Sequence, residues 1–91
     1  MKKPELAAAI ALQADVTKEK AGEIINIFTD EITAAMRKDD PVTLIGFGTF
    51  SRRERSARTG KNPQTGETLQ IAASKSVGFK AGKSLKESVN T

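Results

Sequence analysis

Residues 52–75 read RRERSARTGKNPQTGETLQIAASK, and this stretch decides the fold because it cannot fold inward. Its only large aliphatic side chains are Leu69 and Ile71. Between Arg52 and Lys61 it carries five basic residues against one acidic residue. A segment with so little to bury and such dense positive charge is expected to lie on a negatively charged partner.

The centre of this stretch, residues 60–66, has the composition of a turn. Its glycines supply positive φ, Pro63 fixes φ, and Asn62 can hydrogen-bond its own backbone. We therefore predict a β-hairpin arm over 52–75 that projects from a compact body. Each leg of about ten residues at roughly 3.3 Å per residue would reach about 30 Å. That length is enough to curl round a duplex whose minor groove is about 6 Å wide.

The chain of 91 residues is long enough for one domain. With 52–75 set aside, 67 residues remain to form a core, and a domain that small buries only roughly 60% of its surface. Oligomerisation would compensate for this. The chain has no cysteine and no histidine, so it lacks disulfides, thiolate metal sites, the usual general base and the commonest zinc ligand.

Positive charge is concentrated in the second half of the chain. Residues 1–40 hold six basic and eight acidic side chains, whereas residues 41–91 hold nine basic and three acidic ones. Such asymmetry indicates binding to nucleic acid or to an anionic membrane. A membrane surface would need an aromatic or leucine-rich amphipathic helix beside the lysines, and the arm has neither. Leu6–Leu12 is too short an apolar run for a signal peptide, so we expect a cytoplasmic protein with no membrane partner.

Two helices are predicted over residues 1–40. Pro4 suits a helix start, where its missing N–H is no loss, and this short helix should end near Ala14. Thr17 is the predicted N-cap of a second, longer helix, which Pro41 terminates. One broad apolar stripe marks the second helix and consists of Ala21, Ile24, Ile25, Phe28, Ile32, Ala35 and Met36.

A small antiparallel sheet is predicted after the helices, which makes the fold α+β. Val42–Ile45 is short and β-branched, and the glycine-rich corner Gly46–Phe50 leads into a second strand that continues as the arm. Val77–Lys80 is the return strand. Gly82 opens a last helix that is too short to stand alone and must dock on the body. Three phenylalanines at the strand roots should share one core with the long helix, namely Phe47, Phe50 and Phe79.

Two glycine-rich stretches match nucleotide-binding motifs only in part. Gly46–Ser51 begins like G-x-G-x-x-G but leads into a strand, whereas such a site needs a helix. Gly78–Ser84 has three residues between its glycines where a P-loop has four. The start of the last helix, Gly82–Ser84, could hold one phosphate or could simply be a cap. We interpret Asp39 and Asp40 as a solvated loop, and we predict no metal, no cofactor, no catalytic residue and no enzyme.

Four arginines fall within seven positions of the arm: Arg52, Arg53, Arg55 and Arg58. Solvated faces also carry runs of charge, but a run this dense with little apolar backing favours contact with phosphates and the minor groove. Pro63 at the hairpin tip could be a mere turn former. The sharper hypothesis makes Pro63 an apolar wedge between base pairs, as in proteins that bend DNA from the minor groove.

Several short runs closely resemble the bacterial histone-like HU proteins and the related integration host factor subunits. They are Gly46–Phe50, Glu54–Arg55, Ala57–Gly60, Asn62–Gly66, Phe79–Lys83 and Leu85–Lys86. The resemblance covers essentially the whole chain, and the run at the arm tip is highly specific. It implies an intertwined homodimer or heterodimer in which two helical hairpins form the base and each chain sends one arm around the DNA.

The resemblance also implies a layout and a set of roles. One domain would comprise a helical hairpin (1–40), a sheet body with a C-terminal helix (41–51 and 76–91) and a DNA-binding arm (52–75). The implied DNA-binding residues are Lys3, Arg53, Arg55, Arg58, Lys61, Asn62, Pro63, Gln64, Thr65, Lys75, Lys80, Lys83 and Lys86, with Pro63 intercalating. The implied dimer core consists of Phe28, Ile32, Met36, Leu44, Phe47, Phe50 and Phe79.

The sequence departs from the pattern of these proteins in three places. Lys61 stands where the family usually has arginine, so the charge is kept but the planar fork is lost. Val77–Gly78 replaces a proline usually found two residues before Phe79, and we expect a looser hinge of the arm. Asp39 and Pro41 alter a loop that commonly carries glycine after the long helix.

We therefore expect an architectural protein of the nucleoid that binds duplex DNA with little sequence preference and bends, wraps and stabilises it. Bent, nicked or gapped DNA should be preferred, and affinity should fall steeply with salt because it comes from phosphate neutralisation. Two alternatives stay open: a sequence-preferring bending subunit of the integration host factor type, and an RNA-binding regulator.

Overall fold

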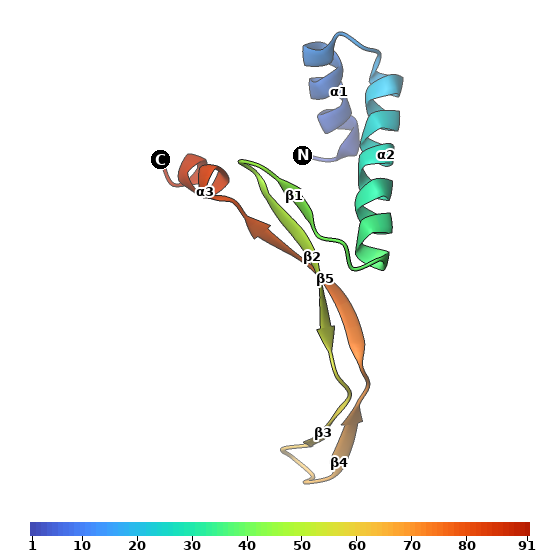
Figure 1. Ribbon diagram of the computed structural model, residues 1–91, viewed down its shortest axis with the longest axis vertical. Coiled ribbons are helices and arrows are strands. Elements are labelled where there is room, and N and C mark those ends of the chain that lie inside the picture. Colours follow the sequence, from blue (N-terminus) through green and yellow to red (C-terminus); the bar gives the residue numbers. More distant parts are fainter.

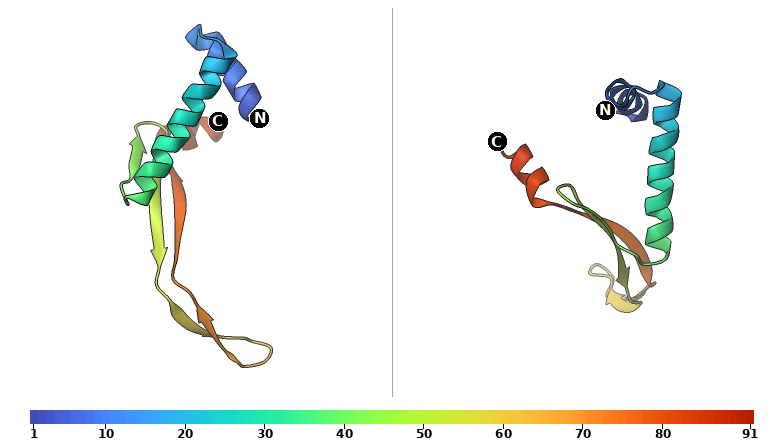
Figure 2. Two further views of the ribbon diagram at one scale, coloured as in Figure 1. Left: turned by 90° about the vertical axis from the view of Figure 1, so that its right-hand side faces the viewer. Right: turned by 45° about the horizontal axis from the view of Figure 1, so that its top comes forward.

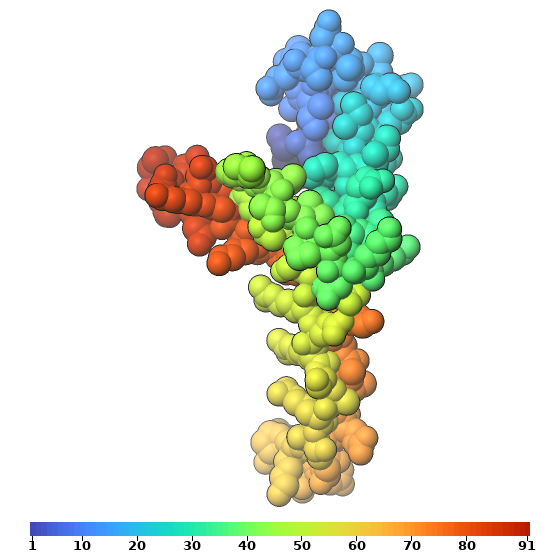
Figure 3. All heavy atoms as spheres, viewed as in Figure 1, coloured from blue at the N-terminus to red at the C-terminus, as the bar shows by residue number.

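The structure, a computed structural model, describes residues 1–91 as a body of helices and sheet with one long arm (Figure 1). The elements are α1 (Lys3–Ala14), α2 (Lys18–Arg37), β1 (Val42–Leu44), β2 (Gly48–Arg55), β3 (Arg58–Lys61), β4 (Thr68–Ile71), β5 (Ser74–Ala81) and α3 (Lys83–Val89). The predicted α+β fold is confirmed. The radius of gyration is 19.1 Å, whereas a compact domain of this length would have about 12 Å. The arm accounts for the difference, and Figure 3 shows it as a narrow stalk below a wider body.

α1 and α2 form the predicted helical hairpin. The hydroxyl of Thr17 accepts a 3.1 Å hydrogen bond from the N–H of Lys20, which satisfies one free amide in the first turn of α2. Each helix is followed by an aspartate in the left-handed conformation, Asp15 and Asp39, both with φ of 56°. Glycine is common at such positions because it adopts positive φ without strain. The backbone at Asp39 therefore has a conformation for which glycine is the usual residue. None of the three helices combines the length and apolar character needed to cross a bilayer.

The body contains a three-stranded antiparallel sheet in the order β1-β2-β5. β2 pairs with β5 from Gly48 opposite Ala81 to Arg55 opposite Ser74. β2 is therefore the central strand, and it runs on past the body into the arm. The predicted strands exist, but β5 begins at Ser74 and is longer than the predicted return strand because the inner arm belongs to the same ladder.

The arm consists of two ladders, whereas one continuous hairpin was predicted. The inner ladder of β2 and β5 ends at Arg55 and Ser74, and an outer ladder pairs β3 with β4. The small residues at 56–57 and 72–73 separate the ladders, and such side chains offer little cross-strand packing. In the left view of Figure 2 the outer part is turned away from the line of the inner part.

A single chain has almost no hydrophobic core. Only three apolar side chains are buried, those of Ala7, Ala21 and Met36. The ring of Phe79 packs against Phe47 and Phe50, with centroid distances of 5.3 and 4.8 Å. Phe47 and Phe79 nevertheless stay 45% and 41% exposed, and Phe28 of α2 is 47% exposed. The predicted aromatic cluster exists, but one chain leaves it half open.

α3 does not dock on the rest of its own chain as predicted. α3 makes few contacts with the other helices and strands, and the side chain of Val89 is 76% exposed. A 2.7 Å hydrogen bond from the N–H of Gly82 to the carbonyl of Phe47 anchors its start. Figure 1 shows α3 on the side of the sheet away from the helical hairpin. A helix this short is marginal on its own.

Candidate nucleic-acid interface

Alternation of side chains along β2 gives the inner arm two distinct faces. Arg52 donates hydrogen bonds to carbonyls at the end of α2. The face that Arg52 shares with Phe50 and Glu54 is therefore the helix side. Arg53 and Arg55 lie on the opposite face, where both are exposed.

The face away from the helices continues from β2 onto β5. Lys80 pairs with Thr49, so Lys80 lies on the same face as Arg53 and Arg55. We call this side of the β2–β5 ladder the open face, and its basic residues are Arg53, Arg55 and Lys80. The guanidinium of Arg53 lies across Gly78, because a Cβ placed on Gly78 would come within 2.7 Å of the Nε of Arg53. The glycine thus leaves room for Arg53 to lie along the sheet.

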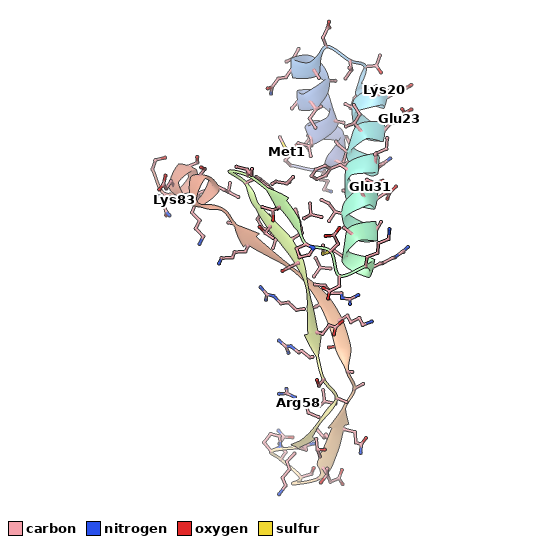
Figure 4. The ribbon with its side chains drawn as sticks, in the orientation of Figure 1. Met1, Lys20, Glu23, Glu31, Arg58 and Lys83 are labelled. Carbon is pink, nitrogen blue, oxygen red and sulfur yellow. The ribbon has the colours of Figure 1, made fainter.

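The outer ladder carries two further cations on opposite faces. Arg58 pairs with Ile71, and Lys61 pairs with Thr68. Because Arg58 and Lys61 are three positions apart on one strand, their side chains point to different sides. Both are exposed, and Figure 4 shows Arg58 on the arm, far from the helices.

The tip of the arm is held by hydrogen bonds that centre on Asn62. Its N–H donates to the carbonyl of Glu67 at 2.8 Å, and its Oδ1 accepts from the N–H of Gln64 at 2.9 Å. The Oγ1 of Thr65 accepts from the N–H of Glu67 at 3.3 Å. These bonds shape a turn in which Pro63 is exposed. Of the predicted tip residues, Asn62, Gln64 and Thr65 take part in the hydrogen bonds that close the turn. Pro63 takes part in none of these bonds and is exposed in the turn.

A second basic site lies where the sheet meets α3. A hollow there is lined by Thr49, Lys80, Lys83, Lys86 and Glu87 among others. Lys83 is 90% exposed, and its Nζ lies 3.9 Å from the carboxylate of Glu87. An exposed pair at that distance contributes little, so Lys83 is free to meet an anion. Figure 4 shows Lys83 at the start of α3.

Two predicted residues lie apart from these surfaces. Lys3 donates a hydrogen bond to the Oδ1 of Asn26 across the helical hairpin. Lys75 pairs with Glu54, which puts it on the helix side of the arm. Within a single chain, neither Lys3 nor Lys75 lies on the open face.

Arg52 departs from the expectation that all four arginines of the arm face a nucleic acid. Its side chain is only 17% exposed and points to the end of α2. The density of charge does not distinguish Arg52 from its neighbours. The alternation of side chains along a strand does, because Arg52 lies two positions after Phe50 and therefore on the same, inward face. The implied dimer-core residues also differ in burial: Met36 is buried, Ile32, Leu44 and Phe50 are half-buried, and Phe28, Phe47 and Phe79 are exposed.

A helical hairpin bearing a small sheet with a basic two-stranded arm defines a class of arm-bearing α+β proteins suited to nucleic acid. The family model described as bacterial DNA-binding protein matches residues 1–90, and the chain belongs to that family, in which its relatives are HU proteins. The resemblance seen in the sequence is confirmed.

Three similar proteins illustrate this relationship. DNA-binding protein HU-alpha of Pseudomonas aeruginosa is 60% identical over 90 residues, which cover 99% of this chain and 100% of that protein. DNA-binding protein HU-beta of Pseudomonas fluorescens is 54% identical with the same coverage. Among solved structures, an Anabaena HU-DNA cocrystal structure matches with a TM-score of 0.85 and 44% identity, covering 98% of this chain and 97% of that one.

Proposed function

We propose that this protein is a histone-like architectural protein that binds the minor groove of DNA with little sequence preference and bends, wraps and stabilises the duplex. The observation that carries this proposal is the open face, where Arg53 and Arg55 of the arm and Lys80 of the body lie on the face of the β2–β5 ladder that is turned away from α2. Contacts from such cations to phosphates carry no sequence information. A surface built from them therefore binds different duplexes alike.

The tip of the arm supports low sequence preference as well. The side-chain oxygens of Asn62 and Thr65 accept hydrogen bonds from the turn itself, so fewer polar groups are left to read base edges. Pro63 is exposed and apolar, and we assign it the wedge role that minor-groove benders, HU among them, use to open a base step.

The working unit that we propose is a dimer, either of two copies or with a related chain. Phe28, Phe47 and Phe79 are each more than 40% exposed. Burying a fully exposed phenylalanine contributes about 1.5–3 kcal/mol, so a partner that covers a half-exposed ring gains about 1 kcal/mol from each. The loosely held α3 is a further element that a partner would stabilise. Sedimentation of the purified chain tests this: a dimer at micromolar concentration shows that one chain type suffices.

Family membership supports a place and a role for the protein in the cell. We propose that it acts on the chromosome in the bacterial nucleoid, within the cytoplasm, and that it works by binding alone, without catalysis. Bending a short site costs about 1–6 kcal/mol. DNA that is already bent, nicked or gapped avoids part of that cost, so we propose these forms as preferred ligands.

The experiment that tests the proposal is a band-shift titration of intact and nicked duplexes of equal length and unrelated sequence at two salt concentrations. We expect tighter binding to nicked DNA whatever its sequence, by about tenfold if the nick spares about 1.4 kcal/mol of bending. Equal affinity for intact and nicked DNA would contradict structure-selective bending. Binding to one sequence alone would point to the integration host factor type. Competition by structured RNA at equal concentration would point to an RNA-binding regulator.

A further inference from the structure

The guanidinium of Arg52 is engaged entirely within the chain. Its Nη1 donates to the carbonyl of Arg37 at 3.1 Å and to that of Met36 at 3.4 Å. Its Nη2 lies 2.8 Å from the Oε1 of Glu54. Its Nε is buried without an acceptor. Every nitrogen of this group is therefore bonded inside the protein or buried, and none is offered to a phosphate.

The carbonyls that Arg52 binds lie in the last turn of α2. Carbonyls there have no partner within the helix and carry the negative end of the helix dipole, so a cation is stabilised beside them. The Oδ2 of Asp39, in the loop that follows α2, lies 3.8 Å from Nη2. One side chain thus links three segments: the end of α2, the loop after it and β2. Figure 1 shows that the arm leaves the body next to this end of α2.

We propose that Arg52 is a positioning residue, an arm clamp that fixes the direction in which the arm leaves the body. This inference rests on the proposed function, because the direction of the arm matters when the arm embraces DNA. Beyond the clamp the arm is a two-stranded ribbon, and the molecule measures 60 Å along its longest axis. A small rotation at the root therefore moves Pro63 at the tip by a large distance.

The arm clamp also explains why the inner arm tolerates an acidic residue. A free carboxylate on a DNA-binding arm would repel phosphates. Glu54 instead lies on the helix side of β2, and its Oε1 is paired with the Nη2 of Arg52. The pair keeps the negative charge compensated and turned away from Arg53 and Arg55 on the open face.

The first test uses the protein without DNA and compares Arg52→Gln with Arg53→Gln, its neighbour on the open face. Amide hydrogen exchange is measured along β2 and β5 at a fixed protomer concentration. We expect Arg52→Gln to speed exchange in the inner arm by about tenfold, the effect of losing one charge-assisted hydrogen bond. Arg53→Gln should leave it unchanged. Equal exchange in Arg52→Gln and the parent protein would overturn the proposal.

The second test measures DNA affinity against salt together with the bend angle. Each phosphate contact contributes about 0.9 to the slope of log affinity against log salt. Arg53→Gln should flatten this slope by about 0.9 for each arm that touches the DNA, whereas Arg52→Gln should keep the slope and broaden the distribution of bend angles. A slope flattened by Arg52→Gln as much as by Arg53→Gln would make Arg52 a phosphate contact and overturn the clamp.

Two further variants separate the clamp from a loss of folding. Glu54→Gln weakens the contact of Arg52 with β2 and leaves its hydrogen bonds to α2 in place. This variant should also speed amide exchange in the inner arm, but by less than Arg52→Gln does. Arg52→Lys keeps the positive charge at the end of α2 but lacks the fork, so it should restore part of the protection. No effect of Glu54→Gln on exchange would count against the clamp. Failure of the parent protein to bind DNA would refute the proposed function, while the exchange measurements would still judge the clamp.

Discussion

Gly48 lies against the ring of Phe79, and a Cβ atom placed on Gly48 would come within 2.5 Å of the Cζ of that ring. The same Cβ would lie 2.6 Å from the backbone oxygen of Lys80. Neither neighbour can move freely, because Lys80 belongs to the strand paired with β2 and Phe79 packs against Phe47 and Phe50. The close approach of β2 to the aromatic cluster therefore requires glycine at position 48.

Gly48→Ala should lower the free energy of unfolding by about 1–3 kcal/mol, the usual effect of overfilling a packed site. Urea denaturation at a fixed protomer concentration measures the change. Gly22→Ala in α2 is the matched control, because a Cβ there meets no atom within 4 Å. The control should gain about 0.5–1 kcal/mol, since alanine is the better helix former. Equal stability of Gly48→Ala and the parent protein would show that the sheet can shift to accept the methyl group.

Asp15→Gly should stabilise the protein. Asp15 ends α1 with φ of 56°, and its N–H donates to the carbonyl of Ala11. The left-handed conformation costs a residue with a Cβ about 1–2 kcal/mol, while the greater freedom of unfolded glycine costs about 0.5–1 kcal/mol. The net gain is about 0.5–1 kcal/mol, seen as a higher Tm at equal protomer concentration.

Ala14→Gly is the control for Asp15→Gly. Ala14 is the last residue of α1 and has no positive φ, so glycine there loses up to about 1 kcal/mol of helix propensity. A lower Tm for Asp15→Gly than for the parent protein would mean that the aspartate side chain compensates for its backbone conformation.

The parts of the fold that could be predicted from the sequence depend on local chemistry. Thr17 caps α2 because a hydroxyl before a helix accepts a backbone N–H. Gly66 has φ of 73° in the tip loop, as turn residues indicated. Each of these features depends only on residues a few positions away in the sequence, so it can be predicted without knowledge of the tertiary structure.

The rest could not be predicted because it depends on interactions between distant residues. Arg52 and Arg53 are adjacent and identical in type, yet one binds the end of α2 and the other lies across Gly78. Their different roles follow from which face of β2 meets α2, and charge density does not report this. The break between the two ladders of the arm and the loose attachment of α3 likewise depend on packing that short polar runs do not encode.

Arg58→Ala should weaken binding to all DNA sequences alike and flatten the salt dependence. Arg58 is exposed on β3 (Figure 4), and removing one phosphate-binding cation from each arm lowers the slope of log affinity against log salt by about 0.9 per arm. Thr59→Ala, on the other face of the same strand, removes no charge and should keep the slope. Fluorescence anisotropy with two unrelated duplexes over a salt series measures both. Weaker binding to one duplex alone would mean that Arg58 reads bases.

Pro63→Ala should reduce DNA bending more than affinity. The hydrogen bonds of Asn62 with Gln64 and Glu67 do not involve Pro63, so the turn survives the change. The variant lacks the rigid apolar ring that would enter a base step. A distance between two dyes on a short duplex should lengthen in the complex with Pro63→Ala, while Gln64→Ala at the adjacent position should leave it as in the parent complex. Since phosphate binding supplies most of the affinity, Kd should change by only a few fold, and an unchanged dye distance for Pro63→Ala would exclude the wedge.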